Sequence, residues 1–252
     1  LTVSADAGDN PQPNSWRYGE EASGEQLNRA YTASANLKKE DFGALRKGID
    51  VSYAQGKIDW AKVKASGIEF AILRLCYGYH YGYDEQFKYN ASECERLGIP
   101  YGVYVYSYTE TAKETQLEAE NALNLLEGYS PSYPVYFDLE DSIVLNAAKK
   151  TGNASKWISE QAVSFCQIME DNGYTPGIYA NLNWFNYYLN STTVDKYEKW
   201  VAQYNLECQY KKPYAMWQYS SAGSVDGIKG DVDLNFDFKE RTDEPVFRYE
   251  RI

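Results

Sequence analysis

Short apolar runs alternate with amphipathic stretches along most of the chain after residue 45. The runs IEFAILRL, YGVYVYSY and PVYFDLE have the length and the β-branched and aromatic content of buried strands. The stretches between them repeat apolar residues at helical spacing. An alternation of this kind predicts an α/β fold.

Capping residues mark the ends of the amphipathic stretches. Asp59 opens a stretch that closes at Gly67, and Asp84 opens one that closes at Gly98. Aspartate is favoured at helix starts and glycine just past helix ends. Helices are predicted at residues 59–67, 84–98, 112–126, 155–172 and 183–189.

The strand pattern predicts a closed barrel. After about residue 200 the loops are too short and too polar for full crossover helices. Helices after the early strands alone favour a barrel of the (β/α)8 kind whose last part has lost its helices. The eight predicted strands begin near Ile49, Phe70, Tyr101, Val135, Gly177, Trp200, Ala215 and Asp231.

Composition divides the chain into three parts. Residues 1–45 are rich in Asn, Gly, Ser, Ala and Glu and have few aliphatics, so we expect an arm or linker and not an independent domain. Residues 46–240 are expected to form the barrel, and residues 241–252 a C-terminal tail.

The charge balance narrows the class of partner. The chain has 25 Lys and Arg residues against 36 Asp and Glu residues, a net charge of −11. This balance argues against a nucleic acid held by phosphate neutralisation. No apolar run approaches the ~20 residues that a membrane span needs, so we expect no membrane insertion. The first residues lack the basic and apolar regions of a signal peptide.

The scarcity of histidine limits the possible chemistry. His80 is the single histidine. We therefore expect neither a multi-histidine metal site nor a Ser-His-Asp triad. No CxxC pair is present, and we expect buried free thiols at Cys76, Cys94, Cys166 and Cys208. We therefore expect no metal and no organic cofactor, and chemistry carried by carboxylates, phenols, amides or lysines.

Two acids end the fourth predicted strand. In PVYFDLE the period of two puts Asp138 and Glu140 on one face. Close carboxyls keep at least one of the pair protonated near neutral pH, and glycosidic cleavage needs such a donor together with a second carboxylate. The alternative interpretation is ordinary solvated acidity at a strand end.

Two further acids favour the catalytic interpretation. Asp50 lies in the first strand and Asp233 in the last, and these strands are neighbours when a barrel closes. We therefore expect all four acids to line one mouth.

Aromatic residues fit a wide polar site. The chain has 25 Tyr, 6 Trp and 9 Phe, and tyrosine packs on one side while hydrogen-bonding on the other. Tyrosines at 77, 79, 81 and 83 form either a stacking platform or a loop that packs on itself. The predicted substrate contacts are Tyr77, Tyr106, Tyr108, Tyr179, Asn181, Trp184 and Gln218.

The segment KGIDVSYAQGKIDWAKVKASGIEFAILRLCYG and the motifs PVYFDLE, GIYAN, WQYSS and VDLN together resemble glycoside hydrolase family 25, the Chalaropsis-type lysozymes, over about residues 46–238. The resemblance implies a (β/α)5(β)3 barrel that hydrolyses the β-1,4 bond between N-acetylmuramic acid and N-acetylglucosamine in peptidoglycan. It implies Glu140 as general acid, with Asp138, Asp50 and Asp233 as its acidic partners.

Two other functions stay open. A chitinase-like hydrolase of N-acetylglucosamine polymers also uses an acid at a strand end, but its D-x-D-x-E pattern has Tyr136 here at the first position. A catalytically silent glycan-binding barrel would have no need to keep four acids together. For the muramidase we expect a monomer that acts on peptidoglycan glycan strands, outside the cell or at the cell wall.

Overall fold

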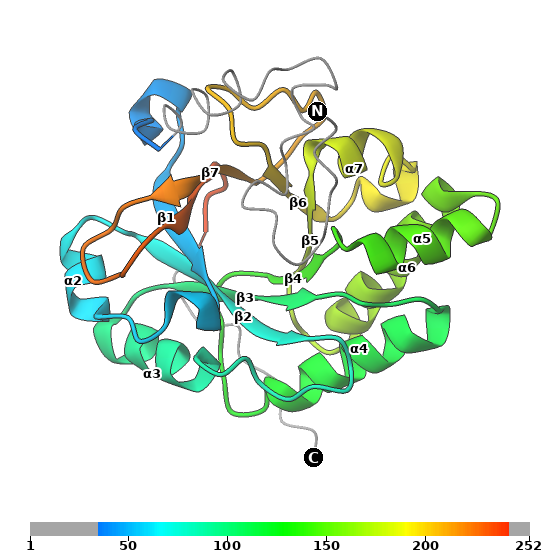
Figure 1. Cartoon of the computed structure of the whole chain (residues 1–252), viewed down its shortest axis with the longest axis horizontal. Coiled ribbons are helices and arrows are strands. Elements are labelled where there is room, and N and C mark those ends of the chain that lie inside the picture. Colours follow the sequence, from blue (N-terminus) through cyan, green and yellow to red (C-terminus); the bar gives the residue numbers. More distant parts are fainter. Residues whose placement is uncertain (1–34, 242–252) are drawn as a thin grey trace.

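The computed structural model describes residues 35–241, and within them eight strands close into one barrel in sequence order (Figure 1). Each strand begins within a few residues of its predicted start, so the predicted barrel is confirmed. The strands are β1 (Arg46–Val51), β2 (Phe70–Tyr77), β3 (Tyr101–Tyr106), β4 (Val135–Asp138), β5 (Pro176–Asn181), β6 (Glu198–Ala202), β7 (Met216–Gly223) and β8 (Val232–Asp237).

Helices cover the side of the barrel formed by the early strands (Figure 1). They are α2 (Trp60–Ala65), α3 (Phe87–Leu97), α4 (Ala112–Leu125), α5 (Ser142–Lys150), α6 (Ala154–Asp171) and α7 (Leu182–Tyr187). Short 3-10 helices are η2 (Lys39–Phe42), η3 (Tyr53–Gln55) and η4 (Thr192–Val194). No α-helix follows β6, β7 or β8 in the described part of the chain, which agrees with the prediction.

Helix α5 is a difference from the sequence analysis, which predicts no helix there. Its N-cap is Asp141, whose carboxylate accepts a hydrogen bond from the Ile143 amide at 2.7 Å. Asp141, the residue after the PVYFDLE motif, thus starts a helix.

Alternation along the strands separates two cores. One face of the sheet packs against the helices through residues such as Val103 and Phe137. The other face fills the barrel with a smaller aromatic cluster, whose buried members are Phe70, Ile72, Tyr133, Tyr136, Tyr179, Trp200, Ala202 and Met216. Gly177 leaves room for this filling, because a Cβ there would lie 2.3 Å from the Tyr136 ring. The barrel is therefore a packed core and not a channel.

The last strand runs against the others. Strand β8 pairs antiparallel with both β1 and β7, while the pairs from β1–β2 to β6–β7 are parallel. Asp233 lies near the amino end of β8, and in a parallel strand it would face the wrong end of the barrel. The reversed direction places Asp233 opposite Asp50.

The end of the expected N-terminal arm packs on the barrel. The Phe42 ring lies 5.3 Å from that of Trp217 and 5.8 Å from that of Phe236. Lys39 Nζ lies 2.6 Å from a Glu69 carboxylate oxygen. Residues 1–34 of the arm and residues 242–252 of the expected tail lie outside the described residues.

The four cysteines are free thiols, as predicted. Cys76, Cys94 and Cys166 are buried, whereas Cys208 is half-buried and differs in this from the prediction. His80 is exposed at the surface. None of the helices in residues 35–241 has the length and apolar character of a membrane span.

Candidate active site

The four predicted acids meet at the carboxyl end of the parallel strands. Asp50 is in β1, Asp138 is the last residue of β4, and Glu140 follows two residues later. Asp233 is the ladder partner of Asp50 in β8. The charge of Asp50 raises the pKa of each of the other three acids, which shows that they share one electrostatic environment.

Asp50 is held by side-chain amides. Its Oδ2 accepts hydrogen bonds from Gln218 Nε2 at 2.9 Å and from Asn235 Nδ2 at 2.7 Å. The Asp50 residue is 6% exposed. Burial raises the pKa of Asp50 to about 6, and hydrogen bonds from Asn235, Gln218 and Asp233 oppose that rise.

Aromatic donors hold the two amides in turn. Trp200 Nε1 donates to Asn235 Oδ1 at 2.7 Å. The hydroxyls of Tyr179 and Tyr204 donate to Gln218 Oε1 at 2.9 Å and 3.2 Å. All five side chains are buried, so Asp50 sits at the end of a network that cannot easily reorient.

Unlike Asp50, the carboxyls of Asp138 and Glu140 at the end of β4 each have an oxygen without a hydrogen-bond partner in the described chain. Asp138 Oδ1 and Glu140 Oε2 are buried and have no hydrogen-bond partner among residues 35–241. Asn181 Nδ2, at the end of the neighbouring strand β5, is in the same condition. Because buried polar atoms are nearly always paired, these three atoms can receive a polar ligand or water.

Burial and mutual repulsion favour protonated carboxyls at this end. Burial, with the charges of Asp141 and Asp50, raises the pKa of Glu140 to about 7. Burial, with the charges of Glu140 and Asp50, raises the pKa of Asp138 well above its ordinary value. Burial and the neighbouring Asp50 do the same for Asp233. A proton donor is therefore available near neutral pH.

Arg74 supplies positive charge beside these acids. Its Nε donates to Asp84 Oδ2 at 2.8 Å, and its guanidinium carbon lies 4.9 Å and 5.2 Å from the ring centres of Tyr53 and Tyr77. The charge of Arg74 lowers the pKa of Asp138, against the larger effect of burial. The Arg74 side chain thus favours the ionised form of one member of the β4 pair.

Tyrosine side chains stand at the ends of β2 and β3. The Tyr77 ring is 4.6 Å from that of Tyr81 and 6.4 Å from that of Tyr108. The Tyr106 ring is 5.2 Å from that of Tyr108, and its hydroxyl donates to Asp141 Oδ2 at 3.0 Å. Tyr81 is 51% exposed and Tyr108 37%. We call these four residues the tyrosine rim.

The tyrosine-rich segment divides between its two interpretations. Tyr77 and Tyr81 belong to the rim, while Tyr83 stacks on Phe87 at 5.4 Å and donates its hydroxyl to the Leu125 carbonyl. Tyr79 packs on His80, with ring centres 3.8 Å apart. Half of the segment is thus a rim and half is packing.

The buried acid Glu118 holds the turn after β3. Its carboxylate accepts hydrogen bonds from Ser107 Oγ at 2.7 Å and from the Tyr108 amide at 2.9 Å. Glu118 is fully buried in helix α4. It therefore fixes the backbone that carries Tyr108.

Three predicted contacts lie deeper than expected. Tyr179 and Gln218 are 5% and 2% exposed and bond to each other. Trp184 is 1% exposed, packs in the core between sheet and helices, and lies against Tyr188 at 5.7 Å. The structure thus brings Tyr179 and Gln218 to the acids as supports, and it does not bring Trp184 to an open surface.

Asn181 has a double environment. Its Oδ1 accepts a hydrogen bond from the Trp184 amide at 2.9 Å and so caps α7. Its Nδ2 is the unpaired donor described above. The side chain is thereby fixed with its donor free for a ligand.

Sequence reasoning missed Arg74 and Asn235. The period-two alternation of strands could have identified both residues. Arg74 is two and four residues from the inward-facing Ile72 and Phe70. Asn235 is two residues from Asp233 on the same face. No sequence signal points to Trp200 as the partner of Asn235, since that contact joins two distant strands.

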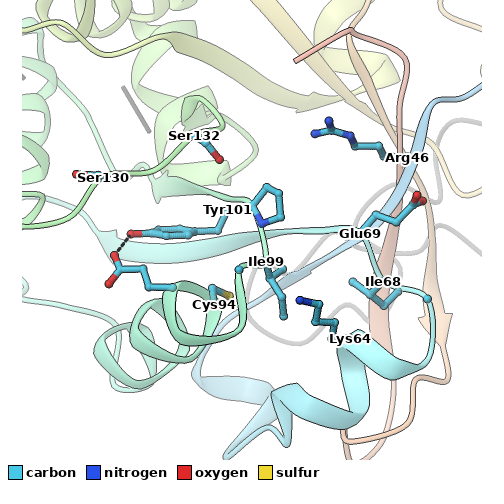
Figure 2. Close-up of a pocket in the computed structure, with 13 residues that line it drawn as sticks. Arg46, Lys64, Ile68, Glu69, Cys94, Ile99, Tyr101, Ser130 and Ser132 are labelled. Carbon is cyan, nitrogen blue, oxygen red and sulfur yellow. Dashed lines mark hydrogen bonds between the residues drawn. The ribbon is translucent and has the colours of Figure 1, made fainter. Parts of the chain in front are cut away.

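A pocket of about 600 Å³ lies at the opposite end, where β1 to β4 begin (Figure 2). Several of the polar side chains that line it are paired within the protein. Tyr101 donates its hydroxyl to Glu95 Oε1 at 2.8 Å, and Lys64 donates to the Leu97 carbonyl. It contains no acid cluster of the kind described above. Among the described residues, no group of three or more His, Cys, Asp or Glu side chains could hold a metal ion.

Comparisons with known proteins agree with this geometry. The sequence model described as glycosyl hydrolases family 25 matches residues 49–228. The autolytic lysozyme of Clostridium acetobutylicum is 30% identical over 190 residues, which cover 75% of this chain and 55% of the relative. Lysozyme M1 of Streptomyces globisporus is 28% identical over 201 residues, with 75% and 66% covered.

A solved structure gives the same result. The modular autolysin LytC from Streptococcus pneumoniae, in complex with a synthetic peptidoglycan ligand, superposes with a TM-score of 0.68 at 30% identity. The match covers 76% of this chain and 46% of that protein. The chain thus spans about half the length of that autolysin and of the clostridial lysozyme.

Proposed function

The chain belongs to glycosyl hydrolases family 25, and from this premise we propose that it is a lysozyme that cleaves the β-1,4 bond between N-acetylmuramic acid and N-acetylglucosamine. The observation that carries the proposal is the β4 pair. Asp138 and Glu140 each keep a buried oxygen without a partner in the described chain. Unsatisfied carboxyls at the mouth of a barrel suit a reaction that develops positive charge on a sugar.

Glu140 is the general acid in this proposal. A pKa of about 7 leaves much of it protonated near neutral pH while keeping proton transfer to the leaving oxygen favourable. Asp138 and Asp50 act on the other side of the bond, where a carboxylate stabilises the positive sugar carbon or orients the acetamido group. Asp233 supports Asp50 as its ladder partner.

The substrate contacts are proposed at the mouth. Tyr77, Tyr106 and Tyr108 offer ring faces and edges to the sugars, since aromatic side chains present an apolar surface beside a polar tip. Asn181 offers its free Nδ2 donor to a sugar oxygen. Tyr179 and Gln218 act beneath the sugar through their bonds to each other and to Asp50.

Partners and location follow from the substrate. The autolysin relative is described in complex with a peptidoglycan ligand, and we propose glycan strands of peptidoglycan as the partner here. Peptidoglycan lies outside the cytoplasmic membrane, so action outside the cell or at the wall is proposed. We also propose that the chain acts as a monomer without metal or organic cofactor, because the acids and amides at the mouth supply the required groups.

Mass analysis of fragments from purified peptidoglycan tests the proposal. The expected products carry N-acetylmuramic acid at the new reducing end, and Glu140→Gln should lower their release by several orders of magnitude. Products ending in reducing N-acetylglucosamine, or cleavage confined to chitin oligomers, would contradict it. Wall binding without release of reducing ends would instead identify a silent binding protein.

The second half of the reaction has two routes. A nucleophilic Asp138 or Asp50 forms a covalent sugar intermediate, whereas the acetamido route needs a carboxylate to orient the N-acetyl group. A fluorinated substrate that slows the second step should leave a sugar on an aspartate in the first case. In the second case no adduct forms, and activity depends on the N-acetyl group.

A further inference from the structure

The hydrogen bond between Trp200 and Asn235 can run in one direction only. The indole N–H of Trp200 is a donor only, and it lies 2.7 Å from Asn235 Oδ1. Turning the Asn235 amide over would set its NH2 group against the indole N–H. The other end of the amide is therefore a donor, and it lies 2.7 Å from Asp50 Oδ2.

Gln218 completes the same arrangement from β7. Its Oε1 accepts from the hydroxyls of Tyr179 and Tyr204, which leaves its Nε2 to donate to Asp50 Oδ2 at 2.9 Å. Asp50 Oδ2 thus receives two amide donors. An oxygen that accepts two N–H groups is the position where a carboxylate keeps its charge.

Asp233, on the antiparallel strand β8, is the ladder partner of Asp50. Both are buried carboxyls that lie opposite each other on neighbouring strands, and burial raises the pKa of each. Two buried carboxylates side by side repel each other, so the pair holds one proton near neutral pH.

We propose that Asp233 carries this proton and Asp50 the negative charge, and that Trp200, Asn235 and Gln218 are positioning residues that enforce the assignment. The inference rests on the proposed function only for the role of that charge. On that role, Asp50 presents a fixed carboxylate to the sugar and Asp233 acts as a hydrogen-bond donor to it. No proton needs to move within the pair during the reaction.

The groups around Asp50 are consistent with this assignment. Asp138 and Glu140 face it from the end of β4, Tyr104 from β3 and Tyr179 from β5. Repulsion from the β4 acids opposes charge on Asp50, and the amide donors oppose that repulsion. Burial raises the pKa of Asp233 well above its ordinary value, while that of Asp50 rises to about 6.

Asparagine substitutions test the assignment directly. Asparagine at 233 keeps a donor toward Asp50, whereas asparagine at 50 removes the charge. We expect Asp233→Asn to lower kcat less than tenfold and Asp50→Asn to lower it on the order of a thousandfold. Equal losses, or the larger loss at position 233, would overturn the assignment.

A tryptophan pair tests the positioning role. Trp200→Phe removes the indole donor and lets the Asn235 amide turn over, so kcat should fall while KM changes little. The acid limb of the pH profile should move up by roughly half to one unit, because Asp50 loses a donor to its charged form. Trp217→Phe is the matched control, since this buried indole donates to the Gln203 backbone carbonyl. The control should leave the acid limb in place, and a shift equal to that of Trp200→Phe would contradict the positioning role.

Direct observation of the protons separates this inference from the proposed function. NMR titration of protein labelled at the aspartate carboxyl carbons, with Asp233→Asn to assign one signal, should show Asp233 protonated through neutral pH and Asp50 ionised above about 6. The reverse order overturns the inference even if the protein cleaves peptidoglycan. The expected order with no cleavage contradicts the proposed function alone.

Discussion

The two ends of the barrel both bury carboxylates but treat them differently. At the amino end of β1, Asp237 is 0% exposed and lies 2.7 Å from Arg241 Nε, and Glu198 lies 2.9 Å from Arg241 Nη2. Lys39 pairs with Glu69 on this side, and Lys239 is a second partner of Glu198. At the carboxyl end, Asp138 and Glu140 keep unpaired oxygens.

The difference separates stability from chemistry. A buried acid paired with arginine contributes to the fold only while the pair is intact, and loss of one partner is strongly destabilising. A buried acid without a partner weakens the folded state, and protein sites keep such groups where a ligand or a reaction uses them. The paired acids at the amino end thus stabilise the closed barrel. The unpaired acids at the carboxyl end are available for a ligand or a reaction.

Among the variants that compare the two ends, the largest effect is expected from Asp138→Asn at the carboxyl end. The rate of glycan cleavage should fall on the order of a hundredfold to a thousandfold, because a charge or nucleophile beside the sugar is lost. The free energy of unfolding at pH 8 should rise by on the order of 1 kcal/mol, because asparagine need not be ionised in a buried site. Reducing-end assays and urea unfolding measure the two. A variant that loses both activity and stability would remove the contrast between the ends.

Arg241→Met at the amino end should lower stability and leave the activity of the folded protein nearly unchanged. It leaves Asp237 and part of the Glu198 carboxylate buried without the guanidinium, and we expect a loss of about 3–5 kcal/mol in the free energy of unfolding. Cleavage per folded molecule should stay close to that of the unchanged protein at a temperature where both are folded. A large drop in kcat for the folded variant would show that the two ends are not independent.

The pH dependence of activity and of stability also tests the difference between the two ends, and its expected effect is of intermediate size. Activity should fall as Glu140 loses its proton above pH of about 7 and as Asp50 gains one below about 6. Both pKa values are raised in the folded state, so the stability from these groups is full below their ordinary values and declines as pH rises toward 7. Glu118, with a pKa raised by burial to about 7, adds to the same decline.

Unfolding curves between pH 4 and pH 8 measure this slope. Glu140→Gln should flatten it in part, since Glu118 remains. An unchanged slope in that variant would mean that Glu140 titrates at its ordinary pKa.

The smallest effect is expected from the tyrosine rim. Tyr81→Ala should raise KM for long glycan strands roughly twofold to tenfold with little change in kcat, since one exposed stacking surface is lost. Tyr187→Ala is the control, because Tyr187 is 65% exposed on α7 outside the rim. Equal changes in KM would argue against the rim as a sugar contact.

Local pattern was enough to predict the barrel and the gathering of its acids. Period-two alternation placed Asp138 and Glu140 on one face, and closure placed Asp50 beside Asp233. The direction of β8 was not predictable in this way, because strand periodicity is the same in both directions. The position of Asp233 beside Asp50 nevertheless depends on the direction of β8.

Contacts between distant residues set the limit of prediction. Gln218 was expected to face the substrate, yet its amide is engaged with Asp50, 168 positions away in the chain. Trp184 follows β5 directly, and whether it faces the mouth or the core depends on how the short helix α7 packs. Periodicity gives the face of a strand but not the partner on the far side of a barrel.

The hairpin of β7 and β8 has a consequence for natural variation among relatives. Its connecting segment, residues 224–231, decides which residues of the returning strand point inward. Deleting or inserting a single position next to Val232 would turn Asp233 and Asn235 to the outside together. Viable changes of length at that junction should therefore occur in steps of two, or be accompanied by a compensating bulge.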